Sequence, residues 1–154
     1  MEITELHKRP TIENNARLYR KYLQFEKLLN ELKMKELTTE IVRSINEDIK
    51  QLNAITNSEK ELGKQLRKRQ TRILRIIEKE LKLVTKNHYR NTWLAIGMSA
   101  FGIPLGVAFG ASFGNMAFIG IGLPIGMTIG IAVGTAMDKK ASESGKQLEL
   151  EIKY

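Results

Sequence analysis

The residues of this chain with the widest scope for chemistry are its histidines and basic side chains, and their spacing argues against catalysis. The sequence holds two histidines, His7 and His88, and neither has a second metal ligand at helical spacing. It holds no cysteine, which excludes disulfides, thiol catalysis and cysteine-type zinc sites. Nucleophile-elbow and phosphate-loop motifs are also missing from the sequence. We therefore expect no enzyme activity, no catalytic residue, no metal and no cofactor.

Basic residues are concentrated just before a long uncharged segment. Residues 60–90 hold 11 basic and three acidic side chains, whereas residues 1–59 hold ten of each. The cations that flank the uncharged segment, together with an interfacial tryptophan, are predicted to contact anionic lipid headgroups. This predicted headgroup set is Lys79, Lys82, Lys86, Arg90, Trp93, Lys139 and Lys140.

A second basic set lies farther from the uncharged segment and consists of Arg67, Lys68, Arg69, Arg72 and Arg75. On a helix that projects upright from a membrane these residues would stand about 25–35 Å from it, at a rise of about 1.5 Å per residue. That distance exceeds the Debye length of about 8 Å, so lipid would not explain them. We interpret them as an interaction face for nucleic acid or an acidic protein, with an ordinary solvated face as the alternative.

The uncharged segment covers residues 91–137, 47 positions without Asp, Glu, Lys or Arg. One membrane span takes about 20 helical residues, so the segment predicts a hairpin of two spans. We place the spans at residues 92–113 and 116–137, with a turn at Gly114 and Asn115, because this dipeptide accepts left-handed backbone. Lysine and arginine outside both spans predict that both chain termini lie in the cytoplasm.

The two predicted spans share an internal repeat in which every fourth residue is glycine. The glycines are Gly102, Gly106, Gly110 and Gly114 in the first span, and Gly122, Gly126, Gly130 and Gly134 in the second. Each set forms one strip of bare backbone, which permits close helix packing in lipid. The strips could pack within one hairpin or between copies, and a strip on both helices favours copies. Pro104 and Pro124 occupy equivalent repeat positions and predict related kinks, either a shape or hinge device or a tolerated accident.

The residues before the uncharged segment show helical periodicity. Apolar residues spaced by three and four predict helices over about 12–36 and 41–55, with a break at Thr38 and Thr39. Ser58 and Glu61 form a capping box, from which a third helix is expected to run on to Arg90. The fold class is therefore all-α: an N-terminal helical bundle or coiled-coil stalk, followed by the two-helix transmembrane hairpin. The predicted domains are a cytoplasmic basic helical domain at 1–90, the hairpin at 91–137 and a polar cytoplasmic tail at 138–154.

The stretch from about residue 93 to 148, with two Gly-x-Pro-x-Gly repeats followed by Asp-Lys-Lys-Ala-Ser-Glu-Ser-Gly-Lys-Gln-Leu, resembles glycine-zipper transmembrane hairpins of uncharacterised bacterial membrane proteins. The resemblance covers about a third of the chain. It implies a bacterial source and a tendency to form homo-oligomers in membranes, as in channels and pore formers. It implies no catalytic residue.

These features favour a protein of the bacterial inner membrane that assembles through its glycine helices into an oligomeric pore or membrane-perturbing effector. The cytoplasmic helical domain would control it, in a toxin-like or phage-defence role. The alternative, of a different class, is a non-conducting anchor or adaptor that recruits a protein or nucleic-acid partner through the basic helix at 60–90. The expected partners are thus the lipid bilayer, further copies of the chain and a cytoplasmic macromolecule.

Overall fold

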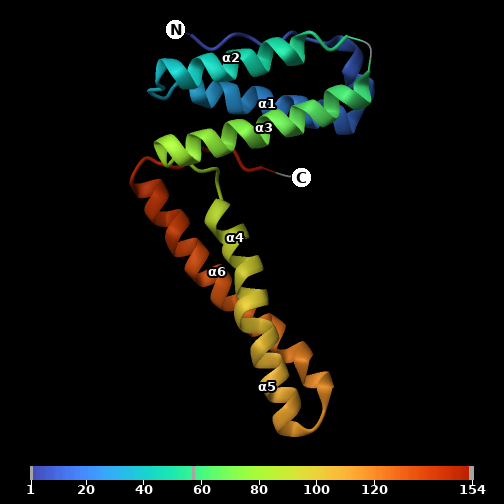
Figure 1. Cartoon of the computed structure of the whole chain (residues 1–154), viewed down its shortest axis with the longest axis vertical. Coiled ribbons are helices and arrows are strands. Elements are labelled where there is room, and N and C mark those ends of the chain that lie inside the picture. Colours follow the sequence, from blue (N-terminus) through green and yellow to red (C-terminus); the bar gives the residue numbers. More distant parts are fainter. Residues whose placement is uncertain (1, 57, 153–154) are drawn as a thin grey trace. The chain divides into compact units, whose positions relative to one another are not determined.

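The computed structural model describes residues 2–56 and 58–152, and over these residues the chain is helical and contains no β-strand (Figure 1). The predicted all-α fold class is confirmed. The chain divides into two compact units: the residues up to Val84 with those from Leu148 onward, and the residues Thr85–Gln147. This division differs from the predicted boundaries at 90 and 138. The outer ends of the predicted first and third domains, residue 1 and residues 153–154, lie outside the described residues.

The first unit contains three amphipathic helices, α1 (Ala16–Lys33), α2 (Thr39–Asn53) and α3 (Glu59–Leu81). Each begins at a polar residue, Asn15, Thr38 or Ser58, whose side chain accepts a hydrogen bond from an amide of the first turn. Helix α3 packs against both α1 and α2. Their buried faces form one core, which includes Phe25, Leu28, Leu32, Ile45, Ile49, Leu52, Leu62, Leu66, Ile73 and Ile77.

The extended segment before α1 is bound to α2 by two asparagines that lie two helical turns apart. Asn46 Oδ1 accepts from the Thr4 amide at 2.8 Å, and Asn46 Nδ2 donates to the Glu2 carbonyl at 2.9 Å. Asn53 makes the same pair of bonds with the His7 amide and the Glu5 carbonyl. A short 3-10 turn, η1 (Pro10–Asn14), then leads into α1, so the helix begins later than the predicted residue 12.

The prediction that the third helix runs on to Arg90 is wrong, because α3 ends at Leu81. Lys82 has the left-handed φ of 57°, its amide donates to the Glu78 carbonyl, and the Leu83 amide donates to Ile77 at 3.2 Å. The bond from the left-handed residue to the carbonyl four residues back is that of an αL helix ending, in which this position is usually glycine. Leu83 and Val84 are then buried in the unit, at 7% and 3% exposure. Burial of these two apolar residues offsets the strain of a left-handed lysine.

The end of the chain returns to the first unit. Leu148 and Leu150 are 2% and 3% exposed and belong to the same core as the helices. The Leu148 amide donates to the Val84 carbonyl at 2.8 Å, and the Glu149 amide donates to Glu31 Oε2 at 2.8 Å. The segment predicted as a polar tail is therefore part helix, part loop and part core of the bundle.

The second unit is a helical hairpin. Its first leg runs through α4 (His88–Gly97), the π-helical turn η2 (Met98–Gly102) and α5 (Ile103–Phe113). Its second leg runs through the 3-10 turn η3 (Met116–Phe118) and α6 (Ile119–Glu143). The legs, of 26 and 28 residues, are long and apolar enough to cross a membrane, and their most apolar windows are only 22% and 17% buried. A core helix of a soluble protein would be mostly buried.

Candidate functional site

The glycines of the repeat lie where the two legs of the hairpin meet. A Cβ on Gly106 would stand 2.6 Å from the Ile119 carbonyl oxygen, and one on Gly126 would stand 2.5 Å from the Gly102 nitrogen. Gly122 faces the backbone of Gly102 and Gly106 just as closely. Real side chains essentially never approach backbone atoms so closely. The contact between the legs is therefore made of backbone on both sides, within a single chain.

The remaining predicted glycines extend or end this contact. Gly130 faces the backbone of Trp93, and Gly134 faces that of Arg90. Gly110 has more room, since its nearest neighbour is Met116 Sδ at 3.3 Å. Gly114 has a φ of +63° and nothing within 4 Å, so it serves the turn and not the packing.

Sequence reasoning missed Gly97, which packs as tightly as the repeat glycines. A Cβ there would lie 2.8 Å from the Gly130 Cα. Gly97 precedes Gly102 by five residues, one more than the repeat spacing. The π-turn η2 absorbs the extra residue, since the Ile103 amide donates to Met98, five residues back. The change in glycine spacing from four to five was the signal for this turn.

The two repeat prolines occupy different local structures. Pro104 follows η2 at the start of α5, whereas Pro124 lies inside the uninterrupted α6. Proline lacks the N–H that would bond four residues back, so Pro104 lowers the cost of changing to π geometry just before it. Near Pro124 the helix stays α-helical, and Thr128 Oγ1 donates to the Pro124 carbonyl at 2.9 Å.

Asp138 closes the open end of the hairpin and was not singled out from the sequence. Its side-chain oxygens accept hydrogen bonds from the amides of Tyr89 at 3.0 Å and Arg90 at 2.9 Å, in the first turn of α4. Asn87, the N-cap residue of α4, makes no side-chain capping bond, so an aspartate from the other leg does this work. Asp138 is 7% exposed. It follows Gly134 by four residues and so continues the glycine strip, a signal present in the sequence.

The outer surface of the hairpin carries the large apolar side chains. Exposed residues of this kind are Ile96, Phe101, Ile103, Val107, Phe113, Met116, Ile121, Ile125, Met127, Ile129 and Val133. Small residues also form an exposed strip on each leg, two positions out of step with the glycines. These strips are Ala100, Pro104, Ala108 and Ser112 on the first leg, and Gly120, Pro124, Thr128, Ala132 and Ala136 on the second. Two residues correspond to about 200° around a helix, so the second strip faces away from the hairpin contact.

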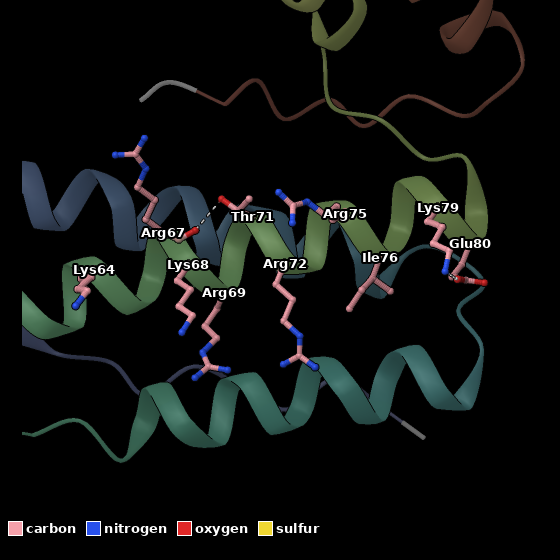
Figure 2. Close-up of a pocket in the computed structure, with 10 residues that line it drawn as sticks. All are labelled: Lys64, Arg67, Lys68, Arg69, Thr71, Arg72, Arg75, Ile76, Lys79 and Glu80. Atoms are coloured by element: carbon pink, nitrogen blue, oxygen red, sulfur yellow. Dashed lines mark hydrogen bonds and ion pairs between the residues drawn. The ribbon is translucent and has the colours of Figure 1, made fainter.

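The predicted basic residues lie along α3 and line a shallow groove of about 670 Å³. Figure 2 shows Lys68, Arg69 and Arg72 extending toward α2, whereas Arg67 extends away from it. The groove also includes Lys64 and Lys79, which extend the set at both ends. Arg69 and Arg72 point toward α2, and the Nη1 atom of each lies 2.8 Å from Asp48 Oδ1. Asp48 is fully buried, and Arg69 is 17% exposed. These two arginines thus bind within the bundle, and sequence reasoning did not find their partner.

The residues predicted to contact headgroups lie at the ends of the helices. Lys79 pairs with Glu80 at 3.7 Å near the end of α3, and Lys82 is the left-handed residue that follows. Lys86 and Arg90 are exposed beside the start of α4, and Lys139 and Lys140 are exposed near the end of α6. Trp93 is half-buried in α4.

Within the part of the chain that the structure describes, no cluster of histidine, aspartate and glutamate has the arrangement of a metal site. Comparison with protein-family models, with curated proteins and with solved structures yields no match to this chain. The hairpin and the groove of α3 are therefore the two candidate functional features of the chain.

Proposed function

We propose that the protein is an integral membrane protein whose hairpin, Thr85–Gln147, crosses the bilayer twice and anchors the helical bundle to it. The observation that supports this proposal most strongly is the packing of the hairpin. Glycine backbone lies at the contact between the legs, and large apolar side chains face outward, the reverse of a water-soluble protein. In water this would leave an extensive apolar surface exposed. In a bilayer the hydrocarbon covers that surface, and close backbone packing holds the legs together.

Lengths and charges also support the anchor. At about 1.5 Å per residue the legs measure about 39 and 42 Å, enough for a hydrocarbon core of about 30 Å. Cations lie at the open end of the hairpin, at Lys86 and Arg90 on one leg and Lys139 and Lys140 on the other. By the positive-inside rule this end, and with it the bundle, faces the cytoplasm of a bacterial cell.

Alkaline extraction of membranes that contain the full chain tests the anchor. We expect the protein to stay in the pellet after carbonate treatment and to dissolve only in detergent. Ile125→Lys combined with Ile129→Lys should move it out of the membrane fraction, because each lysine costs about 3 kcal/mol at the middle of a span. Met34→Lys, an equally drastic change at an exposed residue of the bundle, should have no effect. Release of the unaltered chain by carbonate would contradict the proposal.

A second candidate function is assembly of several hairpins into a pore or membrane-perturbing effector. It is favoured by the outward strips of small residues, which would let neighbouring hairpins approach closely. The glycine strips face each other inside the hairpin, so they no longer argue for assembly. Ser99 and Thr128 donate their hydroxyls to their own helix, at Ala95 and Pro124. A pore lined by such faces would be mostly apolar and gated by dewetting.

Enlarging one outward residue separates the two candidates. Ala132→Leu adds a bulky side chain on the outer strip, whereas Ile129→Leu keeps the volume at a neighbouring exposed position. If hairpins assemble through the strip, Ala132→Leu reduces the cross-linked oligomer and restores the membrane potential that induced expression lowers, and Ile129→Leu does neither. If both variants match the parent, and the parent leaves the potential unchanged, the non-conducting anchor stands and the assembly is wrong.

A further inference from the structure

The groove along α3 is strongly basic. Seven basic side chains line it: Lys64, Arg67, Lys68, Arg69, Arg72, Arg75 and Lys79. Two carboxylates compensate part of this charge, since Asp48 pairs with Arg69 and Arg72, and Glu80 pairs with Lys79. Lys64, Lys68 and Arg75 are exposed and form no ion pair with any described residue. A polyanion is the complementary partner.

The salt bridges to Asp48 give this surface a fixed shape. The two arginines bound to one buried carboxylate fix α3 against α2, so the cations along the helix keep their spacing. From Lys64 to Lys79 the helix rises about 22 Å, which gives an elongated row and not a single pocket. The floor between the charges includes Ile76 and the neutral Thr71. The lining contains no aromatic side chain on which a nucleic-acid base could stack.

Helix α3 ends at Leu81 and does not continue as one straight helix into the membrane. Only such a straight helix would hold these cations far from the headgroups. In the structure six residues, 82–87, separate α3 from α4, and two of them, Lys82 and Asn87, have left-handed backbone. Helix α3 and the first leg are therefore not one continuous helix, so the distance of about 25–35 Å that a straight helix would impose does not apply.

We infer that the basic groove of α3 binds the headgroups of anionic lipids in the membrane that the hairpin crosses. The inference rests on the proposed membrane anchoring, because the anchor holds a high density of headgroup phosphates close to the bundle. Each cation in the row contributes separately to the binding free energy through its attraction to nearby phosphates. Binding therefore requires an anionic surface and no particular lipid. It weakens with salt, since the attraction is screened within about a Debye length.

The absence of cysteine from the sequence permits a specific test. Thr71→Cys places one thiol in the groove without removing a cation, and Asn30→Cys places one on the exposed face of α1. The full chain carrying either change is inserted into nanodiscs of phosphatidylcholine alone, or of phosphatidylcholine with phosphatidylglycerol, and labelled with a charged maleimide. We expect anionic lipid to slow labelling at position 71 by about tenfold or more, since several cations act together. Labelling at position 30 should not change.

Charge reversal supplies the matched control. Lys64→Glu, Lys68→Glu and Arg75→Glu together should abolish the protection of the thiol at position 71, as should high salt. Reversal of three exposed lysines on α1 and α2, Lys27, Lys33 and Lys50, should leave it intact. Equal labelling at position 71 in both lipids, with the chain inserted, would overturn the inference and leave the anchor standing. Protection by an added oligonucleotide in neutral nanodiscs, and none by anionic lipid, would overturn it in favour of nucleic acid.

Discussion

At the scale of single residues, two buried aspartates bind partners of different kinds. Asp138 accepts from two backbone amides at the start of a helix, whereas Asp48 accepts from two arginine side chains. A carboxylate at a helix N-terminus also interacts with the positive end of the helix dipole. The attraction within a buried ion pair must offset the desolvation of both charges, so its net contribution to stability is smaller than that of a carboxylate bound to helix amides. The stability lost on removing Asp48 should therefore be recoverable by also replacing its arginine partner, whereas the stability lost on removing Asp138 should not be, because its partners are backbone amides.

Asp138→Ala should destabilise the hairpin by about 1–3 kcal/mol, because two amides of α4 lose a charged acceptor. Asp138→Asn should cost nearly as much, since an amide keeps one acceptor oxygen and turns a donor toward the second N–H. Lys139→Ala, at the exposed neighbour, is the control and should be close to neutral. Unfolding of the purified chain by titration with SDS, followed by circular dichroism, measures the differences. Equal stability of all four proteins would refute the role of Asp138.

Asp48→Ala should destabilise the bundle by about 3 kcal/mol, because Arg69, which is only 17% exposed, is left as a largely buried charge without its partner. The double variant Asp48→Leu with Arg69→Met should recover most of this loss, since it replaces the pair by apolar groups of similar volume. Arg72 is half-exposed and can turn to water. Thermal unfolding measures the effect, and a double variant less stable than Asp48→Ala would contradict this view of the pair.

At the scale of elements, the glycine contact determines how close the two legs of the hairpin lie. Gly126 and Gly120 belong to the same helix, α6, and occupy different faces of it, Gly120 in the first turn and Gly126 in the interior. A Cβ on Gly126 would stand 2.6 Å from the Gly102 Cα, whereas one on Gly120 would meet nothing within 4 Å. This pair separates the packing of glycine from its low helix propensity.

Gly126→Ala should destabilise the hairpin by about 1–3 kcal/mol. The added methyl group would meet backbone atoms of the first leg, so the two legs would have to move apart. Gly120→Ala should be neutral or stabilising by up to about 1 kcal/mol, the propensity difference measured in water. The same SDS titration compares them. Two variants with equal effects would mean that the legs do not meet along the glycine strip.

The starts of α2 and α3 were predictable from the sequence, and the end of α3 was not. Thr38 and Ser58 carry side chains that accept from helix amides, so their residue types indicated the starts of α2 and α3. The end of α3 depends on a left-handed lysine and on the burial of Leu83 and Val84 against residues distant in the sequence. The order of residues near the end of α3 does not indicate such long-range contacts.

The candidate site was predictable to a similar degree. Glycine spacing located the strip, and Gly97 and Asp138 could have been added by following it one step beyond the repeat in each direction. The partner of the strip could not be read from the sequence, because spacing is the same whether helices meet within one chain or between chains. The pairing of Arg69 and Arg72 with Asp48 depends on the packing of α3 against α2, which also lies beyond any local pattern.

At the scale of the whole molecule, the chain leaves the bundle at Val84 and returns to it at Leu148, and these two residues are joined by a backbone hydrogen bond. Both legs of the hairpin are thus connected to the bundle, one at each side of that bond. The proposed anchor requires that the hairpin cross the membrane completely, with its turn on the far side.

Sidedness of labelling tests that claim most directly. Met116 lies beside the turn and is 63% exposed, and Met116→Cys gives a single thiol there. Asn30→Cys gives one in the bundle. In intact spheroplasts that express the full chain, an impermeant maleimide should label position 116 at once and position 30 only after lysis. Labelling of both thiols only after lysis, or of both before it, would show that the turn and the bundle share one side and would contradict the account.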